Sequence, residues 1–115
     1  MIGNILLEAT ALIPGQSVLG FENHGGRTYL GAGARPFAKV IRGFGNNDTD
    51  HPRNEGCVEG NILGTYLHGS LLPKNPALTD WFIATAMTQK MPQFKLKPVV
   101  SAWEERAFDQ AKSRL

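Results

Sequence analysis

The sequence GTYLHG at residues 64–69 places a histidine, His68, directly after a run of apolar residues and before a glycine. In open α/β sheets, catalytic side chains gather at the ends of strands. An imidazole at such a place can take up and return a proton near neutral pH, which is the chemistry of a general base. The alternative is a histidine that ends a strand and bonds a backbone carbonyl. The local residues leave both interpretations open.

A catalytic histidine needs a nucleophile, and the chain has one cysteine, Cys57. If residues 61–67 form one extended strand, Gly60 and His68 lie roughly 26 Å apart at about 3.3 Å per residue. Cys57 would have to fold back along that strand to reach the imidazole. Neither Cys57 nor any serine lies in a nucleophile elbow, the sharp strand–helix turn that exposes a nucleophile. We therefore expect Cys57 to be a half-buried loop thiol and the nucleophile to be missing from this chain.

A second cluster of polar side chains, FENHGGRT, occupies residues 21–28. Glycines at a strand end can present backbone N–H groups to a ligand, and an arginine can pair with a carboxylate. The segment is therefore a candidate site for a ligand that bears a carboxylate, with a polar hairpin as the alternative. The residues predicted to bind substrate are Asn23, His24, Gly25, Gly26 and Arg27.

Two further patterns carry less information. Asp48, Asp50 and His51 are close in sequence, but they lack a fixed helix or strand spacing, so a solvated loop is expected rather than a metal site. GAGARP at residues 31–36 begins like a dinucleotide-binding fingerprint. It lacks the third glycine and leads into another apparent strand, so we reject that interpretation.

The elements that must position these residues follow the order strands first, helices last. Branched and apolar residues predict strands at residues 2–8, 18–23, 27–30 and 37–41. Residues 43–60 are rich in Gly, Asn and Asp, which predicts a long irregular loop or hairpin tip. Residues 61–67 carry apolar side chains on both faces, which indicates a strand covered on both sides, as inside an α/β sheet.

Two helices are predicted after the strands. The first begins with Asn75 as its cap and Pro76 at its first position, and it ends near residues 89–91. Its apolar face consists of Leu78, Trp81, Phe82 and Ala86. The second helix, residues 101–114, begins with a capping box of Ser101 and Glu104. We therefore expect an α/β domain over residues 1–91 and a helical tail over residues 92–115.

Composition excludes several classes of protein. The 115 residues carry a net charge of +2 without a Lys/Arg cluster, so a nucleic-acid partner is not expected. No apolar run approaches the roughly 20 residues of a membrane-spanning helix. One cysteine excludes an internal disulfide framework and a Cys-based zinc site. The first residues lack a secretory signal and enter a strand at once, so we expect a chain cut inside a larger fold.

Four segments together resemble a known family: GFENHGGRTYLG at residues 20–31, EGN at 59–61, GTYLHG at 64–69 and LLPKNP at 71–76. They resemble the C-terminal half of a CobB/CobQ-like class I glutamine amidotransferase. Within that family they are most similar to the glutamine-hydrolysing subunits of lipid II isoglutaminyl synthase. The likeness runs from about Ile2 to Met87, and the tail from Gln89 adds little. It implies that the fold is the C-terminal part of a flavodoxin-like sheet.

The resemblance implies a Cys–His glutaminase in which His68 is the catalytic histidine. In such an enzyme a thiolate attacks the side-chain amide of glutamine and forms a thioester with release of ammonia. The histidine takes the thiol proton, protonates the ammonia and activates water. The ammonia passes to a Mur-ligase-like partner subunit, which uses ATP and Mg to amidate the D-glutamate of lipid II in peptidoglycan synthesis. The resemblance thus implies a cytoplasmic chain that holds no cofactor itself.

The chain departs from the wider family in two ways. Many class I enzymes carry a carboxylate two residues after the histidine, but here that position is Ser70, so any third catalytic group must come from elsewhere. In the family, the elbow cysteine and the oxyanion-hole amides precede the strand with which this chain begins. The isolated chain is therefore expected to lack glutaminase activity. An incomplete sheet would also expose an apolar edge, which favours self-association.

Two other functions stay open at this point. One is cobyric-type amidation in corrinoid synthesis, which corrinoid genes in the genome neighbourhood would favour over a Mur-ligase-like gene. The other is a non-catalytic module that binds a partner after loss of the nucleophile. Capture of a ligase-like partner without glutaminase activity would favour that third interpretation.

Overall fold

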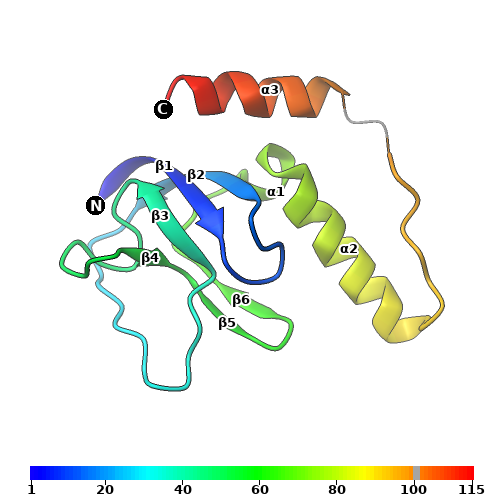
Figure 1. Cartoon of the computed structure of the whole chain (residues 1–115), viewed down its shortest axis with the longest axis horizontal. Coiled ribbons are helices and arrows are strands. Elements are labelled where there is room, and N and C mark those ends of the chain that lie inside the picture. The colour runs from blue at the N-terminus through cyan, green and yellow to red at the C-terminus, as the bar shows by residue number, and fades with distance from the viewer. Residues whose placement is uncertain (100–101) are drawn as a thin grey trace.

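The computed structural model describes residues 1–99 and 102–115 of the chain. Its strands come first in the chain and its helices last (Figure 1). One sheet has the strand order β2-β1-β3-β4 with antiparallel pairing throughout. Its members are β1 (Ile2–Ala9), β2 (Ser17–Asn23), β3 (Ala38–Arg42) and β4 (Asn54–Glu55). A separate antiparallel hairpin consists of β5 (Cys57–Glu59) and β6 (Ile62–Gly64).

The sheet buries one face against the rest of the chain. Ile5, Leu7 and Ala9 alternate along β1 and are buried, because successive side chains of a strand point to opposite faces. The same core cluster includes Val18 from β2, Ala38 from β3, Val58 from β5 and Leu78 from helix α2 (Pro76–Lys90), with Phe37, Ala11 and Leu67. The strands predicted at residues 2–8, 18–23 and 37–41 are therefore confirmed, with bounds that differ by one residue or so.

The prediction of a strand at residues 27–30 is wrong. The backbone there forms no ladder, and the N–H of Thr28 instead donates to the carbonyl oxygen of Asn46 in the loop that follows β3. The prediction of an irregular segment at residues 43–60 is confirmed only up to residue 53, because β4 and β5 lie in the rest of it. Two short strands fit there because Gly56, with a φ of +70°, turns the chain between them.

The prediction of a long, doubly covered strand at residues 61–67 is also wrong. Strand β6 covers only Ile62–Gly64, and its Ile62 side chain is 71% exposed at the end of the hairpin. The apolar residues of this segment contact two different parts of the chain. Leu63 packs on the core next to β5, whereas Leu67 leaves the hairpin and forms a bridge with Glu22 of β2. The described strand pairs are all antiparallel. The apolar side chains on both faces of residues 61–67 therefore do not indicate a parallel strand.

Three helices follow the hairpin: α1 (Leu71–Lys74), α2 (Pro76–Lys90) and α3 (Ala102–Ser113). The predicted α2 is confirmed with Asn75 at its N-cap position, but the Asn75 side chain makes no capping bond. On the predicted apolar face Leu78 is buried and Phe82 packs on the core, while Ala86 is exposed. The short α1 was not predicted. Ser101, the expected cap of α3, lies outside the described residues.

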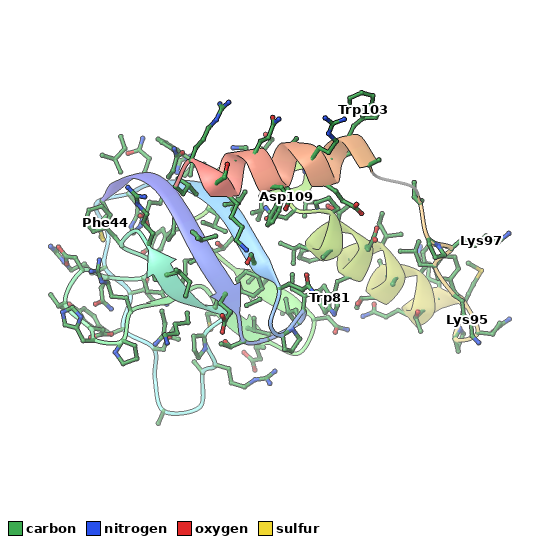
Figure 2. The ribbon with its side chains drawn as sticks, turned by 45° about the horizontal axis from the view of Figure 1, so that its top comes forward. Phe44, Trp81, Lys95, Lys97, Trp103 and Asp109 are labelled. Atoms are coloured by element: carbon green, nitrogen blue, oxygen red, sulfur yellow. The ribbon has the colours of Figure 1, made fainter. Side chains whose placement is uncertain are left out.

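Helix α3 returns across the sheet and contacts β2 and α1 (Figure 1). The Nζ of Lys112 donates a 2.9 Å hydrogen bond to Oγ of Ser17 at the start of β2. Trp103 at the other end of α3 points away from the body of the molecule and is 79% exposed (Figure 2). In the part of the chain that the structure describes, none of the helices has the length and apolarity needed to cross a membrane. The domain boundary at residue 91 stays a prediction.

Candidate functional site

His68 lies beside the end of β2. The preceding residue, Leu67, forms an antiparallel bridge with Glu22, and the N–H of His68 donates a 2.8 Å hydrogen bond to the carbonyl oxygen of Phe21. Gly20 permits this approach, because a Cβ at that position would come within 2.6 Å of Leu67 Cδ2. The backbone of His68 is therefore fixed against a strand of the sheet, although His68 itself is not part of a regular strand.

The His68 ring is exposed and makes one hydrogen bond, between its Nε2 and the carbonyl oxygen of Asn23 at 3.1 Å. The ring also meets Phe21 edge-to-face, with the ring centroids 6.4 Å apart. A carbonyl oxygen can only accept, so Nε2 carries the hydrogen in the neutral ring. The lone pair then lies on Nδ1, and this nitrogen has no partner among the described residues. The arrangement leaves an accessible base on an oriented imidazole.

The segment before His68 is held by a buried carboxylate that the sequence analysis did not single out. Glu55 is fully buried, and its Oε1 accepts hydrogen bonds from Thr65 Oγ1 at 2.7 Å and Tyr66 N at 2.8 Å. Burial raises the pKa of Glu55 from 4.5 to about 7. The Thr65 and Tyr66 hydrogen bonds oppose that rise, and the charge of Glu22 adds to it. In the sequence, the one sign that could have pointed to Glu55 is its position next to Gly56, the glycine that turns the chain between β4 and β5.

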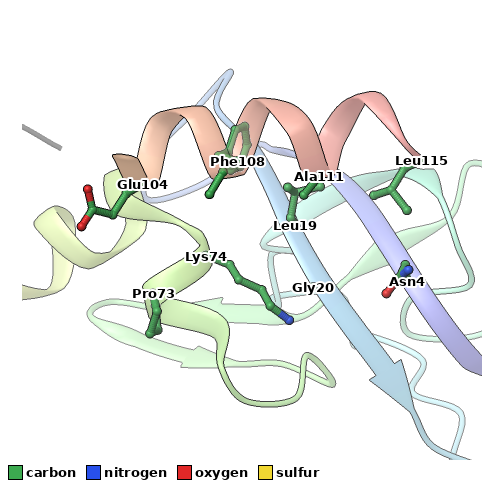
Figure 3. Close-up of a pocket in the computed structure, with 10 residues that line it drawn as sticks. Asn4, Leu19, Gly20, Pro73, Lys74, Glu104, Phe108, Ala111 and Leu115 are labelled. Atoms are coloured by element: carbon green, nitrogen blue, oxygen red, sulfur yellow. The ribbon is translucent and has the colours of Figure 1, made fainter. Parts of the chain in front are cut away.

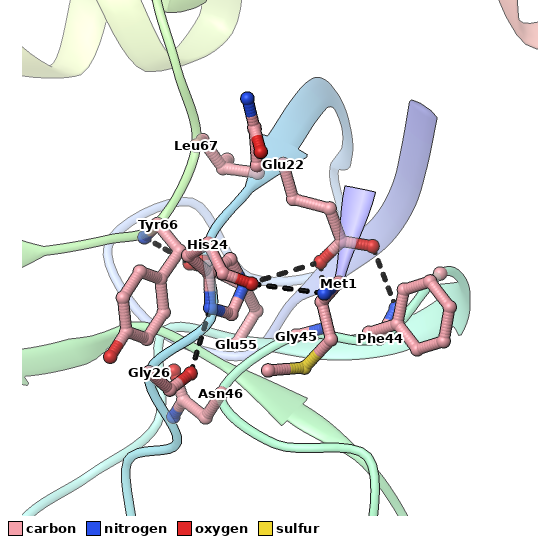
Figure 4. A network of polar contacts seen from close by, with 12 residues as sticks. Met1, Glu22, His24, Gly26, Phe44, Gly45, Asn46, Glu55, Tyr66 and Leu67 are labelled. Carbon is pink, nitrogen blue, oxygen red and sulfur yellow. Dashed lines mark hydrogen bonds and ion pairs between the residues drawn. The ribbon is translucent and has the colours of Figure 1, made fainter. Parts of the chain in front are cut away.

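A second buried carboxylate, Glu22, ties β2 to the loop after β3 (Figure 4). Its Oε1 accepts from Phe44 N at 2.8 Å, and its Oε2 accepts from Gly45 N at 2.9 Å. Gly45 has a φ of +79°, a left-handed conformation that favours glycine. Glu22 lies within the polar cluster at residues 21–28, and each oxygen of its carboxylate accepts from a backbone N–H of this loop.

The five residues predicted to bind substrate have different surroundings in the structure. His24 turns inward, with a side chain that is 7% exposed, and stacks on Tyr66 with the ring centroids 3.7 Å apart. Its Nδ1 lies 2.9 Å from the carbonyl oxygen of Gly26, and its Nε2 lies 3.8 Å from Glu22 Oε2 (Figure 4). Asn23 contributes its carbonyl oxygen to His68. His24 and His68 therefore face different surroundings.

Arg27 is exposed and already paired. Its Nε and Nη2 donate to the two carboxylate oxygens of Asp48 at 2.6 and 3.0 Å. The hydrogen bond from Arg27 lowers the pKa of Asp48 to about 2, and it raises the pKa of Arg27. Gly25 and Gly26 are exposed in the same segment. A role for Asn23 to Arg27 in binding substrate stays a prediction, and Arg27 would have to leave Asp48 to meet a ligand carboxylate.

The loop that holds Asp48 is organised by an amide. Asn47 is buried, and its Oδ1 accepts from Thr49 N and Asp50 N, while its Nδ2 donates to Asp50 Oδ2. His51 is exposed. Across residues 1–99 and 102–115, no three His, Cys, Asp or Glu side chains come together in a way that could hold a metal ion.

Cys57 is half-buried, as expected, but it lies in β5 rather than in a loop, with Gly64 as its cross-strand partner. It also lines a cavity of about 210 Å³ together with Thr28, Asn46, Gly56, Gly64, Thr65 and Tyr66. His68 does not line this cavity. Cys57 therefore occupies a hairpin strand and not a strand-to-helix turn of the kind that exposes a nucleophile.

A further cavity lies between α3 and β2 (Figure 3). It has a volume of about 210 Å³ and includes Leu19 and Gly20 of β2, Pro73 and Lys74 of α1, and Phe108 and Ala111 of α3. None of the residues predicted to bind substrate lines it. It separates α3 from the sheet and does not belong to the His68 site.

Comparison with known proteins places these residues in a family. A model of the CobB/CobQ-like glutamine amidotransferase domain matches residues 1–76, which include both His68 and the polar segment after β2. The chain belongs to this family. The family likeness that the sequence motifs indicated is thereby confirmed, and His68 and Asn23 both lie within the matched region.

Two relatives in this amidotransferase family carry the same name, lipid II isoglutaminyl synthase (glutamine-hydrolyzing) subunit GatD. The one from Staphylococcus aureus is 39% identical over an alignment of 122 positions, which covers 99% of this chain and 47% of the relative. The one from Streptococcus pneumoniae is 37% identical over 78 residues, which is 68% of this chain and 29% of the relative. The chain thus spans less than half the length of either subunit.

A further relative is a probable cobyric acid synthase from Methanothermobacter thermautotrophicus, 47% identical over 55 residues, or 48% of this chain and 10% of the relative. The match to this synthase covers a smaller share of the chain than the match to either GatD subunit. The alignment with the Staphylococcus subunit covers 99% of the chain, so the likeness extends past Met87, where the motifs placed its end.

Proposed function

We propose that this chain is the histidine-bearing part of a glutaminase that supplies ammonia for the amidation of lipid II in peptidoglycan synthesis. The exposed His68 imidazole is the observation that carries the proposal: the Asn23 carbonyl holds Nε2, and Nδ1 has no partner among residues 1–99 and 102–115. The names of the two GatD relatives support the choice of pathway. Glutamine is the proposed substrate and a Mur-ligase-like synthetase subunit the proposed partner.

In the proposed reaction, Nδ1 of His68 accepts the proton of a thiol that lies outside these 115 residues. The thiolate attacks the amide carbon of glutamine, and His68 returns the proton to the leaving nitrogen, so ammonia departs and a thioester forms. His68 then takes a proton from water, which hydrolyses the thioester to glutamate and restores the thiol. The Asn23 carbonyl keeps the ring oriented and accepts a hydrogen bond from the imidazolium form as well.

The proposal assigns no cofactor to this chain. ATP and Mg belong to the synthetase subunit, which activates the acceptor carboxylate, the D-glutamate of lipid II. The whole glutaminase domain is proposed to have a flavodoxin-like sheet, with the antiparallel sheet described above as its C-terminal part. The proposed location is the cytoplasm, where the ATP-dependent partner would act.

A chimera tests the proposal. The aligned segment of the Staphylococcus aureus GatD subunit, 47% of its length, is replaced by this chain, so that the relative supplies the rest of the domain. The product is assayed with the synthetase partner of that subunit. We expect glutamate release from glutamine, and its loss on His68→Ala. The 115-residue chain alone is expected to release none, because Cys57 is its sole cysteine and lies in β5.

Two outcomes would contradict the proposal. An active chimera that keeps its rate after His68→Ala would remove His68 from the mechanism. Steady glutamine hydrolysis by the 115-residue chain would show that the chain contains its own nucleophile. His51→Ala is the matched control, because His51 is exposed and distant in sequence from the His68 segment, and it should leave the rate unchanged.

Cobyric-type amidation remains the second candidate, and the 47% identity over 55 residues is the observation in its favour. The two candidates share the glutaminase step and differ in the partner that uses the ammonia. Copurification separates them: a Mur-ligase-like synthetase supports lipid II amidation, and a corrinoid-binding synthetase supports the alternative.

A further inference from the structure

We propose that Glu55 is a positioning residue for His68, acting through Thr65, Tyr66 and Leu67. The effect on catalysis rests on the proposed glutaminase function, whereas the effect on the order of the His68 ring does not. Glu55 touches neither a substrate nor the imidazole. Its carboxylate instead holds the three residues that lead into His68.

One oxygen of Glu55 accepts both of its hydrogen bonds to the segment that leads into His68. Oε1 of Glu55 accepts from the Thr65 hydroxyl at 2.7 Å and from the Tyr66 N–H at 2.8 Å. The hydroxyl oxygen of Thr65 then accepts from the N–H of Leu67 at 3.0 Å. One buried carboxylate therefore holds the backbone of Tyr66 and the side chain of Thr65 directly, and the backbone of Leu67 through the Thr65 hydroxyl, immediately before the histidine.

The far end of this segment is fixed against β2. Leu67 bridges Glu22, and His68 donates its N–H to Phe21, so the chain has little freedom between the Glu55 carboxylate and the sheet. The Tyr66 ring adds a side-chain anchor, since it stacks on His24 (Figure 4). The Tyr66 hydroxyl also lies 2.8 Å from Thr28 Oγ1. Release of Glu55 would free the end of the segment that β2 does not hold.

Burial of a carboxylate at this position costs free energy. Glu55 is fully buried, and its second oxygen, Oε2, has no hydrogen-bond partner in the part of the chain that is described. The titratable groups around it are Glu22 of β2, whose charge acts on Glu55, and His24 and Tyr66 next to the bonded segment. The ionised form makes charge-assisted bonds to Thr65 and Tyr66, which are stronger than those to a neutral acceptor.

The protonation state of Glu55 therefore sets the strength of its hydrogen bonds with Thr65 and Tyr66. Its pKa is raised to about 7 by burial, so the carboxyl becomes charged as the pH rises through neutrality. The neutral amide of Glu55→Gln can still accept the two hydrogen bonds but cannot ionise. Glu55→Ala removes the acceptor altogether. These two variants separate the loss of the acceptor from the loss of its charge.

The first experiment measures the His68 ring in the full 115-residue chain by NMR with labelled histidine. In wild type we expect a single Nε2–H tautomer for His68, and in Glu55→Ala a mixture of tautomers with broadened ring signals. Glu55→Gln should stay close to wild type. Glu59→Ala, an exposed glutamate on β5 of the same hairpin, is the matched control and should leave the His68 signals unchanged.

Thr65→Val extends the test, because it removes the hydroxyl relay while it keeps a side chain of similar shape. If Glu55→Ala does not fold, Thr65→Val decides the outcome: a His68 signal that shifts toward a tautomer mixture supports the proposal. A folded Glu55→Ala or Thr65→Val chain whose His68 ring signals match wild type would overturn it.

The second experiment uses the chimera described above. Glu55→Ala should lower kcat by about 10- to 100-fold with KM little changed, because small displacements of a catalytic group carry costs of this order. The ratio of kcat in wild type to kcat in Glu55→Gln should rise as the pH passes through 7. A purely structural role would instead lower the amount of folded enzyme and leave this ratio flat. If the wild-type chimera is inactive, the proposed function fails, and the NMR result alone decides the positioning role.

Discussion

At the scale of single residues, two histidines are held by backbone carbonyls through opposite ring nitrogens. His68 uses Nε2 toward the Asn23 carbonyl, and His24 uses Nδ1 toward the Gly26 carbonyl. Because a carbonyl accepts only, each contact selects one neutral tautomer. The third histidine, His51, is exposed and has no such partner among the described residues. The difference matters because His68 is exposed, whereas the free nitrogen of His24 is buried.

We expect these tautomers in solution. Long-range proton–nitrogen correlation spectra of the histidine-labelled chain, recorded above the ordinary histidine pKa of about 6.5, should show Nε2–H for His68 and Nδ1–H for His24. His51 should give the averaged pattern of a free imidazole and serves as the internal reference. A His68 pattern like that of His51 would contradict the assignment of Nδ1 as the base.

Glu55 also links stability to pH. Its pKa is raised from 4.5 to about 7 in the folded chain, so between these values the folded state holds a proton that the unfolded state has lost. The stabilisation from this group is full below the unfolded pKa and disappears as the pH rises through 7. At about 1.4 kcal/mol per pKa unit, the difference amounts to roughly 3 kcal/mol.

Glu55→Gln should remove this dependence. Urea unfolding of both proteins across the pH range measures it, since all other titrating groups are shared. The free energy of unfolding of the variant, relative to wild type, should increase as the pH rises from below 4.5 to above 7. Parallel curves for the two proteins would show that Glu55 titrates at its ordinary value.

At the scale of elements, the segment from β6 to α2 closes the free edge of β2. The Leu67–Glu22 bridge and the His68–Phe21 hydrogen bond close one end. At the other end the Asn75 side chain behaves like a strand residue: its Oδ1 accepts from Leu19 N at 2.8 Å, and its Nδ2 donates to Leu19 O at 2.8 Å. The same Nδ2 also donates to Leu71 O at 2.7 Å, which ties α1 to the sheet.

Substitution of Asn75 should therefore destabilise the chain. Asn75→Ala leaves buried backbone groups of Leu19 unpaired, at a cost of about 1–3 kcal/mol each. Asn75→Asp should be at least as harmful at neutral pH, because its carboxylate would face the Leu19 and Leu71 carbonyl oxygens. It should recover in part below about pH 4, where the aspartate protonates and can donate again.

Chemical unfolding at both pH values measures these effects, with Asn61→Ala at the exposed hairpin end as the control. Asn75→Ala with wild-type stability would show that water replaces the amide without cost. Asn75→Asp with a free energy of unfolding independent of pH would show that its carboxylate does not face the two carbonyls.

At the scale of the whole molecule, the antiparallel sheet is packed on one side by the hairpin and α2 and is crossed by α3 (Figure 1). Several large apolar side chains nevertheless stay exposed, among them Ile2 at 65%, Ile41 at 54% and Phe44 at 37%. Ile2 begins β1, and Ile41 lies near the end of its neighbour β3. The edge of β2 is closed, so these side chains, rather than an unpaired strand edge, are the better basis for the expected self-association.

The 115-residue chain is accordingly expected to self-associate, because contact between copies removes exposed apolar surface from water. Sedimentation velocity over a wide range of concentration should show species larger than a monomer. Ile41→Lys should shift the distribution toward the monomer, whereas Val99→Lys, on the segment before α3, should not. A monomer at all concentrations would remove this expectation.

The sequence by itself determined the family, the three longer strands and the two longer helices, because alternation, turn residues and caps are local signals. His68 and Asn23 could be named because the motifs around them are contiguous. The strand predicted at residues 27–30 failed, and residues 61–67 divided between a hairpin and β2, because apolar character does not reveal which neighbour a side chain will meet. The pairing of Arg27 with Asp48 could not be read from residues that lie 21 positions apart.

Only the tertiary structure decided what the polar residues do. It turned His24 inward, assigned Asn23 a role through its backbone, and placed Glu55 under the residues that lead to His68. These outcomes depend on which donors and acceptors are brought together after burial, when each buried polar group must find a partner or carry the cost of lacking one. That constraint acts between distant segments, and spacing along the chain does not encode it.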